Sequence, residues 1–473
     1  MTSPKIAIIQ LDSADAAYLR QHREALPTIT RLLEEGGETP LLAEPFAGSN
    51  NMTFNTGCRP QAHGVFFQLQ WDPEEMRLRS LAPDWVGDLT PFWRRGKMGE
   101  KRGIVIDPPF TFKAQEVPGI EVLGWNPHSG LGSYACTDAA EGRRIAREYG
   151  VNIIGDERRM SRDVSLLEAE RDQMIASATA RGRLACDLMA TRDWDFLYLV
   201  FGEPHRAGHV LWPKPGATPE GGMLDVMKAV DTALGAVLEA LPEDAHVITF
   251  AAQGMEHQSC QSHFCRPLLE KALGALGFGD PEHGARPGLV AWLRGQIPQR
   301  LQWAIRERIP MSWRDAVVAR EYAAGIVPGE TVAFPMMSDN HGYWRLLVSG
   351  REAQGTLSEE EAGRFRADFA EIIAGFRTPE GEPLVTDVLF PSTEAGERSH
   401  LLPDVVAAWN PEIHPAAEAT HPKLGTIRGT PDLARSGNHR FRAFWVHKGP
   451  EAAERSKPER VADLAEYIEA LTA

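Results

Sequence analysis

Two histidines four positions apart, His205 and His209, are the residues whose type and spacing most clearly suit a chemical role. They follow an apolar run at 196–201 and a Gly-Glu-Pro segment at 202–204, a pattern typical of a buried strand that ends in a break. If residues 205–209 form a helical turn, both imidazoles lie on one face, about 5–6 Å apart at Cβ. This spacing predicts one metal ion, bound at about 2.0–2.1 Å per nitrogen. Two surface histidines at a helix start would show the same pattern.

Asp12 also stands at a position that suits a site residue. It follows the strand-like run 5–11, and the ligand sites of open α/β sheets form beyond the carboxyl ends of the strands. The alternative is that Asp12 caps the next helix.

The segment 257–265 gathers four side chains that can bind metals. His257, Cys260, His263 and Cys265 lie within nine residues. Their spacing matches no established zinc pattern, so a polar loop is the simpler interpretation.

The composition is that of an ordinary globular chain with an acidic balance. Apolar residues make up 43% of the chain, charged residues 24%, and the formal net charge is -15. This charge argues against a nucleic acid partner, but a small anionic substrate is not excluded, because a bound metal sets the local field. The five cysteines do not suggest a disulfide framework, and we find neither a signal-peptide pattern nor an apolar run of roughly 20 residues. We therefore expect a cytoplasmic protein without a membrane partner, as a monomer or a homo-oligomer.

The elements that must position these residues alternate between strands and helices. Apolar periodicity predicts strands at 5–11, 103–106, 196–201, 246–251 and 443–446, and helices at 26–35, 165–191, 224–241 and 459–471. Strand, helix and strand at this spacing predict an α/β fold with a doubly wound, mostly parallel central sheet flanked by helices. Between 256 and 340 the alternation is lost. We therefore expect residues 1–255 and 341–473 to form the core, and 256–340 to form a largely helical cap over the active site.

Several motifs, in order along the chain, point to a known family. Thr56-Gly57, Pro60 and the run His63-Gly64-Val65-Phe66 resemble the segment that follows the nucleophile in the alkaline phosphatase superfamily, in particular its type I phosphodiesterase/nucleotide pyrophosphatase branch with sulfatase-like relatives. Further matches lie at 342–346, 350–352, 402–404 and 437–439. The resemblance covers nearly the whole chain and implies an alkaline phosphatase-like core.

The resemblance implies two metal sites, and the first is present in an altered form. Family members typically bind one ion with an Asp-x-x-x-His pair and a late histidine. The aspartate position falls on His205, the paired histidine on His209, and the late histidine on His439. Three neutral imidazoles therefore replace one carboxylate and two imidazoles, and a fourth position stays open for water or substrate.

The second site of the family is not complete in this sequence. Asp12 is kept, but the family's Asp-His pair falls on Ala252-Gln253 and its nucleophile on Ala47. Alanine and glutamine do not replace a carboxylate and an imidazole as metal ligands, so we expect this site to hold no metal. Ser49 is an alternative nucleophile, although a shift of two residues moves a side chain by several ångströms.

The resemblance also places polar residues where they would contact a substrate. Asn50 and Asn51 are expected to line the pocket or to cap the following helix. Gln253 replaces a family ligand, and His257 and His263 follow a segment that approaches the mouth of the site in the family. All five are therefore candidates for substrate binding.

These assignments favour a metal-dependent hydrolase of a phosphate- or sulfate-type ester. One divalent ion, preferably zinc, would lower the pKa of its bound water toward about 7 and so replace a protein nucleophile. Asp12, Glu203 or His263 would serve as a base or an orienting group. Two alternatives stay open: a scaffold reused for non-hydrolytic iron or copper chemistry, and a metal- or ligand-binding protein without turnover.

Overall fold

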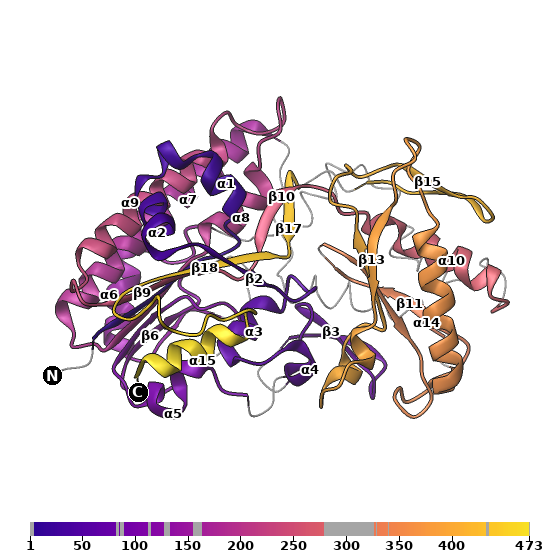
Figure 1. Cartoon of the computed structure of the whole chain (residues 1–473), viewed down its shortest axis with the longest axis horizontal. Helices are drawn as coiled ribbons and strands as arrows, with labels where there is room; N and C mark the ends of the chain where they lie inside the picture. Colours follow the sequence, from indigo (N-terminus) through magenta and orange to yellow (C-terminus); the bar gives the residue numbers. More distant parts are fainter. Residues whose placement is uncertain are drawn as a thin grey trace. The chain divides into compact units, whose positions relative to one another are not determined.

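The computed structural model describes the chain except for residues 1–3, 82–84, 86–88, 112–114, 127–132, 155–162, 279–325, 328, 339, 432–434 and 473. The chain forms two compact units, shown in Figure 1. The first contains residues 1–59, 86–258 and 433–473, and the second contains 60–85 and 259–432. These units divide the chain differently from our expectation, because 341–432 belong to the second unit. Much of the expected cap at 256–340 lies outside the described residues, so its role over the site stays a prediction.

An eight-stranded sheet forms the centre of the first unit. Its strand order is β2-β18-β9-β1-β8-β5-β6-β7. The central strands β9, β1, β8, β5 and β6 are parallel to one another, whereas β18, β2 and β7 add antiparallel edges. The bounds are β1 Ile6–Leu11, β2 Thr39–Leu42, β5 Gly103–Ile106, β6 Gly119–Leu123, β7 Ala135–Cys136, β8 Phe196–Phe201, β9 His246–Ala251 and β18 Arg442–Lys448. The predicted doubly wound, mostly parallel sheet is confirmed.

Helices cover both faces of this sheet, as Figure 1 shows. One face carries α1 Ala16–Gln21, α2 Pro27–Gly36, α7 Val164–Thr191, α8 Glu203–Leu211 and α9 Gly222–Glu239, with α6 Ala139–Tyr149 beside α7. The other face carries α3 Asn50–Thr56, α5 Gly96–Gly99 and α15 Asp463–Glu469. The predicted helices at 26–35 and 165–191 are present, and the closing helix is shorter than 459–471.

The sequence of β1 explains why both faces are covered. Ala7, Ile9 and Leu11 pack in one apolar core with the α7 and α9 side, whereas Ile6 and Ile8 pack in the other with Phe54 of α3. Successive side chains of a strand point to opposite faces, so an almost continuous apolar run requires helices on both sides.

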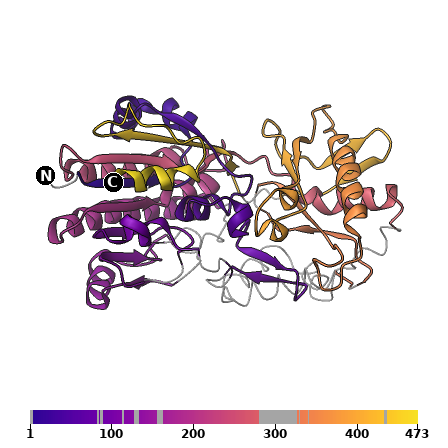
Figure 2. The same ribbon diagram turned by 60° about the horizontal axis from the view of Figure 1, so that its bottom comes forward.

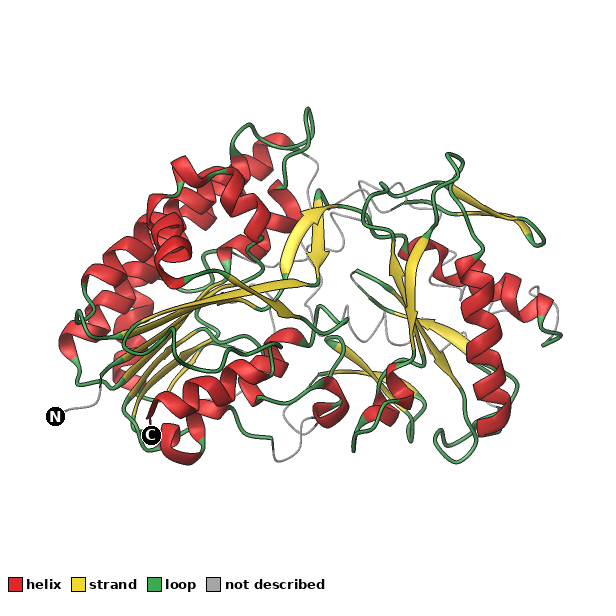
Figure 3. Ribbon diagram, viewed as in Figure 1, coloured by secondary structure: helices red, strands yellow, loops and turns green. Residues whose placement is uncertain are grey.

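The second unit has its own antiparallel sheet, order β11-β12-β14-β13, drawn in yellow in Figure 3. The helices α10 and α14 pack side by side in this unit, as Figures 1 and 2 both show. Ser358 and Glu361 form a capping box at the start of α14. The bounds are α4 Pro60–His63, β3 Leu69–Asp72, β4 Arg77–Ser80, α10 Cys265–Ala275, β11 Ala333–Met336, β12 Gly342–Leu346, α14 Glu359–Ala374, β13 Val385–Leu389, β14 Val405–Trp409, β15 Glu418–His421 and β16 Gly425–Arg428.

Among the described residues, every helix is too short or too polar to cross a bilayer.

A buried pair of histidines in the first unit predicts acid sensitivity. Nδ1 of His246 and Nε2 of His447 are 3.1 Å apart, and Nδ1 of His447 lies 2.7 Å from the hydroxyl of Tyr467. Burial and the neighbouring His246 lower the pKa of His447 from 6.5 to about 4. The unfolded chain therefore binds this proton first, and stability is expected to fall as the pH drops from about 6.5 through 4.

Chemical unfolding at several pH values checks this expectation. His447→Gln removes the titrating group, so the difference in unfolding free energy between pH 7 and pH 5 should be smaller in the variant than in the parent chain. Equal differences would contradict the assignment.

Candidate metal centre

The predicted helical turn carries the two histidines. β8 ends at Phe201, and α8 begins at Glu203 with Pro204 in its first turn, where the missing N–H of proline is tolerated. His205 and His209 are both buried, and their ring centroids are 4.9 Å apart. The i, i+4 spacing therefore places both imidazoles on one face of α8.

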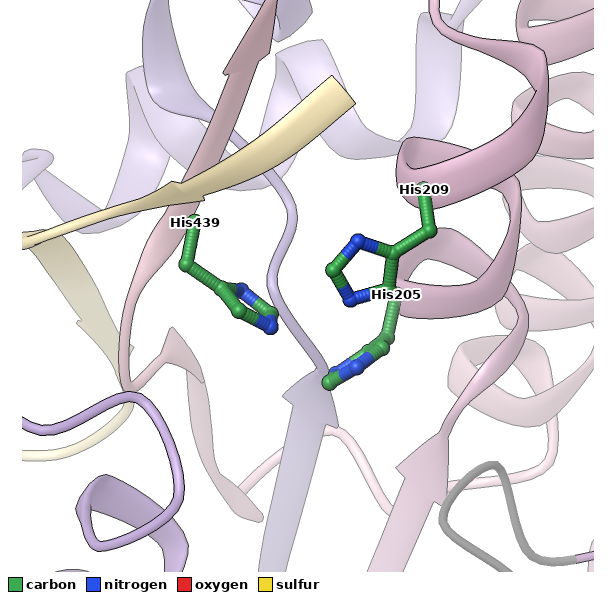
Figure 4. A group of neighbouring side chains, drawn as sticks. All are labelled: His205, His209 and His439. Atoms are coloured by element: carbon green, nitrogen blue, oxygen red, sulfur yellow. The ribbon is translucent and has the colours of Figure 1, made fainter. Parts of the chain in front are cut away.

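His439 completes a group of three imidazoles, shown in Figure 4. It comes from β17, Gly437–Arg440, which pairs antiparallel with β10, Gly254–His257. Its ring centroid lies 4.6 Å from those of His205 and His209, and one nitrogen of each ring lies within 4.8 Å of the others. Nitrogens bound to one zinc ion are about 3.4 Å apart, so a small closure of the rings would bring them to bonding distance.

Two glycines allow helix α8 and strand β17 to approach this closely. A Cβ atom on Gly437 would lie 2.2 Å from the carbonyl oxygen of Gly208. A Cβ atom on Gly208 would lie 2.4 Å from Cγ of Met255 on β10. Only glycine fits at these contacts, which bring His209 and His439 together.

Gly437→Ala is expected to separate α8 from β17. The added methyl group meets backbone atoms that cannot rotate away, so the variant should lose about 1–3 kcal/mol of stability and bind metal more weakly. Metal titration with thermal unfolding measures both effects. Gly222→Ala is the matched control, because its Cβ would be 3.5 Å from the nearest atom. Unchanged metal affinity in Gly437→Ala would contradict this role for the glycine.

The inner nitrogens of two histidines have partners within the first unit. Nδ1 of His205 lies 3.2 Å from a carboxylate oxygen of Asp12 and 3.1 Å from the hydroxyl of Ser13. Nδ1 of His209 lies 3.3 Å from the carbonyl oxygen of Gly437. Metal-binding histidines usually donate their other N–H to such acceptors, which leaves Nε2 for the ion.

The protonation state of His209 also suits a metal ligand. Burial, the Arg435 guanidinium and the neighbouring imidazoles hold the pKa of His209 well below its ordinary value. His209 is therefore neutral at physiological pH, as a ligand must be. Among the described residues, these three histidines are the one group of side chains arranged to hold a metal ion. This geometry fits one divalent cation.

Asp12 lies in a buried network of amide side chains. Nε2 of Gln10 lies 3.3 Å and Nδ2 of Asn51 3.5 Å from Oδ1 of Asp12. The hydroxyl of Tyr198 donates to Oε1 of Gln10 at 2.8 Å. Burial and the Asp12 charge raise the pKa of Tyr198 well above its ordinary value, so its hydroxyl keeps its proton.

Comparison with known proteins gives the chain a family. The family model described as "Type I phosphodiesterase / nucleotide pyrophosphatase" matches residues 6–433. The chain belongs to this family. The family resemblance predicted from the motifs, and with it the alkaline phosphatase superfamily, is confirmed. His439 lies beyond the matched residues, so its place beside His205 and His209 comes from the structure.

Solved structures support the fold. Phosphonoacetate hydrolase from Sinorhizobium meliloti 1021, in complex with phosphonoacetate, is 12% identical with a TM-score of 0.52, covering 99% of this chain and 96% of the other. The same enzyme with phosphonoformate is 14% identical with a TM-score of 0.49 at the same coverage. The first of these similarities shows a shared fold. No curated protein sequence matches the chain.

In the segment where we expected the nucleophile, the polar side chains form hydrogen bonds with the backbone of the same segment. Ser49 is fully buried, and its hydroxyl donates to the carbonyl of Phe46 at 3.0 Å. Asn50 accepts from the amide of Glu44 at 2.7 Å and donates to the carbonyl of Glu44 at 3.1 Å. These bonds hold the loop before α3, so they favour a structural role for both residues over the predicted nucleophile and substrate contact.

Gln253 takes part in the same buried layer. Its Oε1 accepts from Nδ2 of Asn50 at 3.2 Å, and its Nε2 donates to the hydroxyl of Ser13 at 3.2 Å. Asn51 likewise accepts from Nε2 of Gln10 at 2.5 Å. The amides predicted to bind substrate therefore bind one another and the surroundings of Asp12.

Glu203 does not lie with the imidazoles, so its predicted role as a base is corrected. Glu203 lies two residues before His205 on α8, so the two side chains point to opposite sides of the helix. Its Oε1 accepts from Nε of Arg181 at 3.0 Å and from the hydroxyl of Ser177 at 2.6 Å. Glu203 is a buried anchor between α8 and α7.

The two later histidines lie in different units. His257 stands opposite Gly437 in the β10–β17 pair, two residues from Met255, which stands opposite His439. Paired residues and those two apart share a face, so His257 lies on the same face as His439 and stays a candidate for substrate contact. His263 belongs to the second unit, where Nε2 bonds the carbonyl of Ala416 at 2.7 Å. His263 therefore has a partner within its own unit.

All five cysteines of the chain are free thiols, as the absence of a disulfide pattern in the sequence predicts.

Sequence reasoning missed Gln10, Ser13, Tyr198 and Arg181 as residues that surround or support the site. Gln10 had a signal, because it is the one amide in the apolar strand Ile6–Leu11. The others depend on contacts between distant segments.

Proposed function

We propose that the protein is a hydrolase of a phosphate- or sulfate-type ester that uses one divalent metal ion held by His205, His209 and His439. The observation that carries the proposal is the convergence of three buried imidazoles in a member of a phosphodiesterase family, with Nδ1 of two of them on acceptors of the chain. We expect zinc as the ion, because three imidazoles and an open fourth position are a common catalytic zinc site.

A zinc ion at such a site supplies Lewis acidity toward a phosphoryl oxygen and makes a water molecule more acidic. The chain's own contribution is charge and orientation. Three neutral imidazoles leave the full ionic charge of the metal, whereas a carboxylate would cancel part of it. This favours a small anionic substrate.

The side chains at positions 47 and 49 indicate what kind of group attacks the substrate. The hydroxyl of Ser49 is bonded to the Phe46 carbonyl, and Ala47 has no hydroxyl. This favours attack by water over attack by a side chain. His257 is the residue that we propose to contact the substrate, because it lies on the same face of the β10–β17 pair as His439.

Metal content and ester hydrolysis test the proposal together. Elemental mass spectrometry of the purified protein and of the double variant His205→Ala/His439→Ala gives the metal and its stoichiometry. Activity is then measured on aryl phosphate monoesters and diesters, aryl sulfates and phosphonoacetate, the last chosen because the structurally similar enzyme binds it. About one zinc per chain, lost in the double variant together with activity on one of the esters, is the expected result.

Three outcomes would overturn the proposal. One iron or copper ion per chain without turnover of any ester would indicate non-hydrolytic metal chemistry. Two ions per chain would contradict the single site. Absence of bound metal after incubation with zinc would indicate a binding protein without this chemistry.

A further inference from the structure

We propose that Asp12 is a positioning residue for His205: its carboxylate holds the Nδ1–H of His205, so that Nε2 faces the metal, and it does not ligate a second ion. The inference rests on the proposed function, because it requires an ion on the three histidines. It assigns to Asp12 a task different from that of the first-strand aspartate in the two-metal pattern that the resemblance implies.

The first support is the contact itself. Oδ2 of Asp12 is 3.2 Å from Nδ1 of His205, and both side chains are buried. A carboxylate can only accept, so Nδ1 carries the hydrogen and Nε2 holds the lone pair. A neutral imidazole in this tautomer is the form that binds a metal through Nε2, and a carboxylate behind it makes that nitrogen more basic.

The second support comes from the groups around the other carboxylate oxygen. Oδ1 of Asp12 accepts from Nε2 of Gln10 and from Nδ2 of Asn51, at 3.3 and 3.5 Å. The hydroxyl of Tyr198 donates to the Gln10 carbonyl oxygen, which turns the Gln10 N–H groups toward Asp12. A cation beside Oδ1 would meet N–H hydrogens where it needs oxygen lone pairs. The amides therefore support a carboxylate but oppose a second metal ion.

The third support comes from a second group that faces Nδ1 of His205. The hydroxyl of Ser13 is 3.1 Å from Nδ1 of His205 and accepts from Nε2 of Gln253. The Gln253 carbonyl oxygen is itself occupied by Asn50. Gln253 thus presents a donor at the position where the resemblance implies a metal-binding histidine. The two groups that face Nδ1 of His205, the Asp12 carboxylate and the Ser13 hydroxyl, are therefore both held in place by neighbouring amides.

Asp12→Asn is the variant that separates positioning from ligation. The amide keeps the size of the side chain but removes the charge, and loss of such a partner typically weakens metal binding about 10–100-fold. Asp231→Asn is a matched control, because Asp231 is a buried aspartate of the same unit that accepts from the amide of Ile29 at 2.7 Å at the start of α2. His205→Ala is the control for the metal site itself.

Cobalt titration gives a readout independent of activity. The metal-free full-length chain and the three variants are titrated with Co²⁺, the visible absorption of the bound ion is recorded, and a competing chelator gives the dissociation constant. We expect one Co²⁺ per chain in the parent, in Asp12→Asn and in Asp231→Asn. The dissociation constant should rise about 10–100-fold in Asp12→Asn only, with a changed spectrum, and His205→Ala should lose the tight site.

Other outcomes separate failure of this inference from failure of the proposed function. Two Co²⁺ ions in the parent and one in Asp12→Asn, bound with unchanged affinity, would show that Asp12 ligates a second ion. Unchanged affinity and stoichiometry in Asp12→Asn would show that Asp12 does not position His205, while the three-histidine site stands. A parent chain that binds no Co²⁺ would overturn the metal site and the inference with it.

Discussion

His209→Ala is expected to lower the affinity for zinc by roughly two to three orders of magnitude and to remove hydrolytic activity. Complete zinc sites bind with about 10–16 kcal/mol, so one of four ligands contributes on the order of 3–4 kcal/mol. Each 1.4 kcal/mol is about a tenfold change in the dissociation constant. His209 is fully buried, so a replacement ligand cannot easily enter from solvent.

The measurement is a competition between the purified variant and a chelator of known affinity, with ester hydrolysis measured in parallel. His447→Gln is the matched control, because His447 is also a buried histidine of the first unit and bonds His246 and Tyr467 instead of the cluster. It should bind zinc like the parent. An unchanged circular dichroism spectrum will show whether His209→Ala folds. If the folded variant still binds zinc with parental affinity, the assignment of His209 as a zinc ligand is refuted.

The positions of the chemical groups could be predicted where local periodicity decides them. The i, i+4 spacing of His205 and His209 required only that residues 203–211 form a helix, and the apolar run before them required only a strand. The same helical geometry also places Glu203 on the side away from His205. That correction was available from the sequence, because a residue two positions away on a helix faces the other way.

Other parts of the site depend on contacts that no local pattern contains. His439 stands more than two hundred residues after His209 and reaches it through the β10–β17 pair, so only the family resemblance could suggest it. Whether Gln253 bonds substrate or Ser13 depends on the packing of β1, α3 and the end of β9. The division into units likewise depends on the distant segments 60–85 and 259–432, which meet only in the folded chain.

Arg181, which pairs with Glu203 of α8, is the residue whose substitution we expect to lower stability most. Arg181 of α7 is fully buried, with Nη1 2.9 Å from Asp107 and Nε 3.0 Å from Glu203. Its Nη2 donates to the carbonyl of Asn126 at 3.2 Å, and its guanidinium lies 5.3 Å from the ring centre of Trp125. One cation therefore compensates two buried carboxylates and joins α7, α8 and the loops after β5 and β6.

Arg181→Met is expected to destabilise the first unit by about 3–5 kcal/mol, because methionine fills much of the volume but leaves two buried carboxylates uncompensated. For a domain of this size that corresponds to a fall in Tm of roughly 6–20 °C. Thermal and denaturant unfolding measure the loss. A surface ion pair offers the matched control: Lys448→Met removes the exposed contact with Glu35 and should cost well under 1 kcal/mol.

The double variant Arg181→Met/Glu203→Gln distinguishes charge from packing. If the cost of Arg181→Met is the uncompensated charge, neutralising Glu203 should recover part of the lost stability, although each single change is destabilising. If the cost is lost packing, the two losses should add. The same comparison bears on the metal centre, because Glu203 lies in the first turn of α8, two residues before His205. A variant that recovers stability should also recover zinc affinity if this ion-pair network holds the helix, and hence the imidazoles, in position.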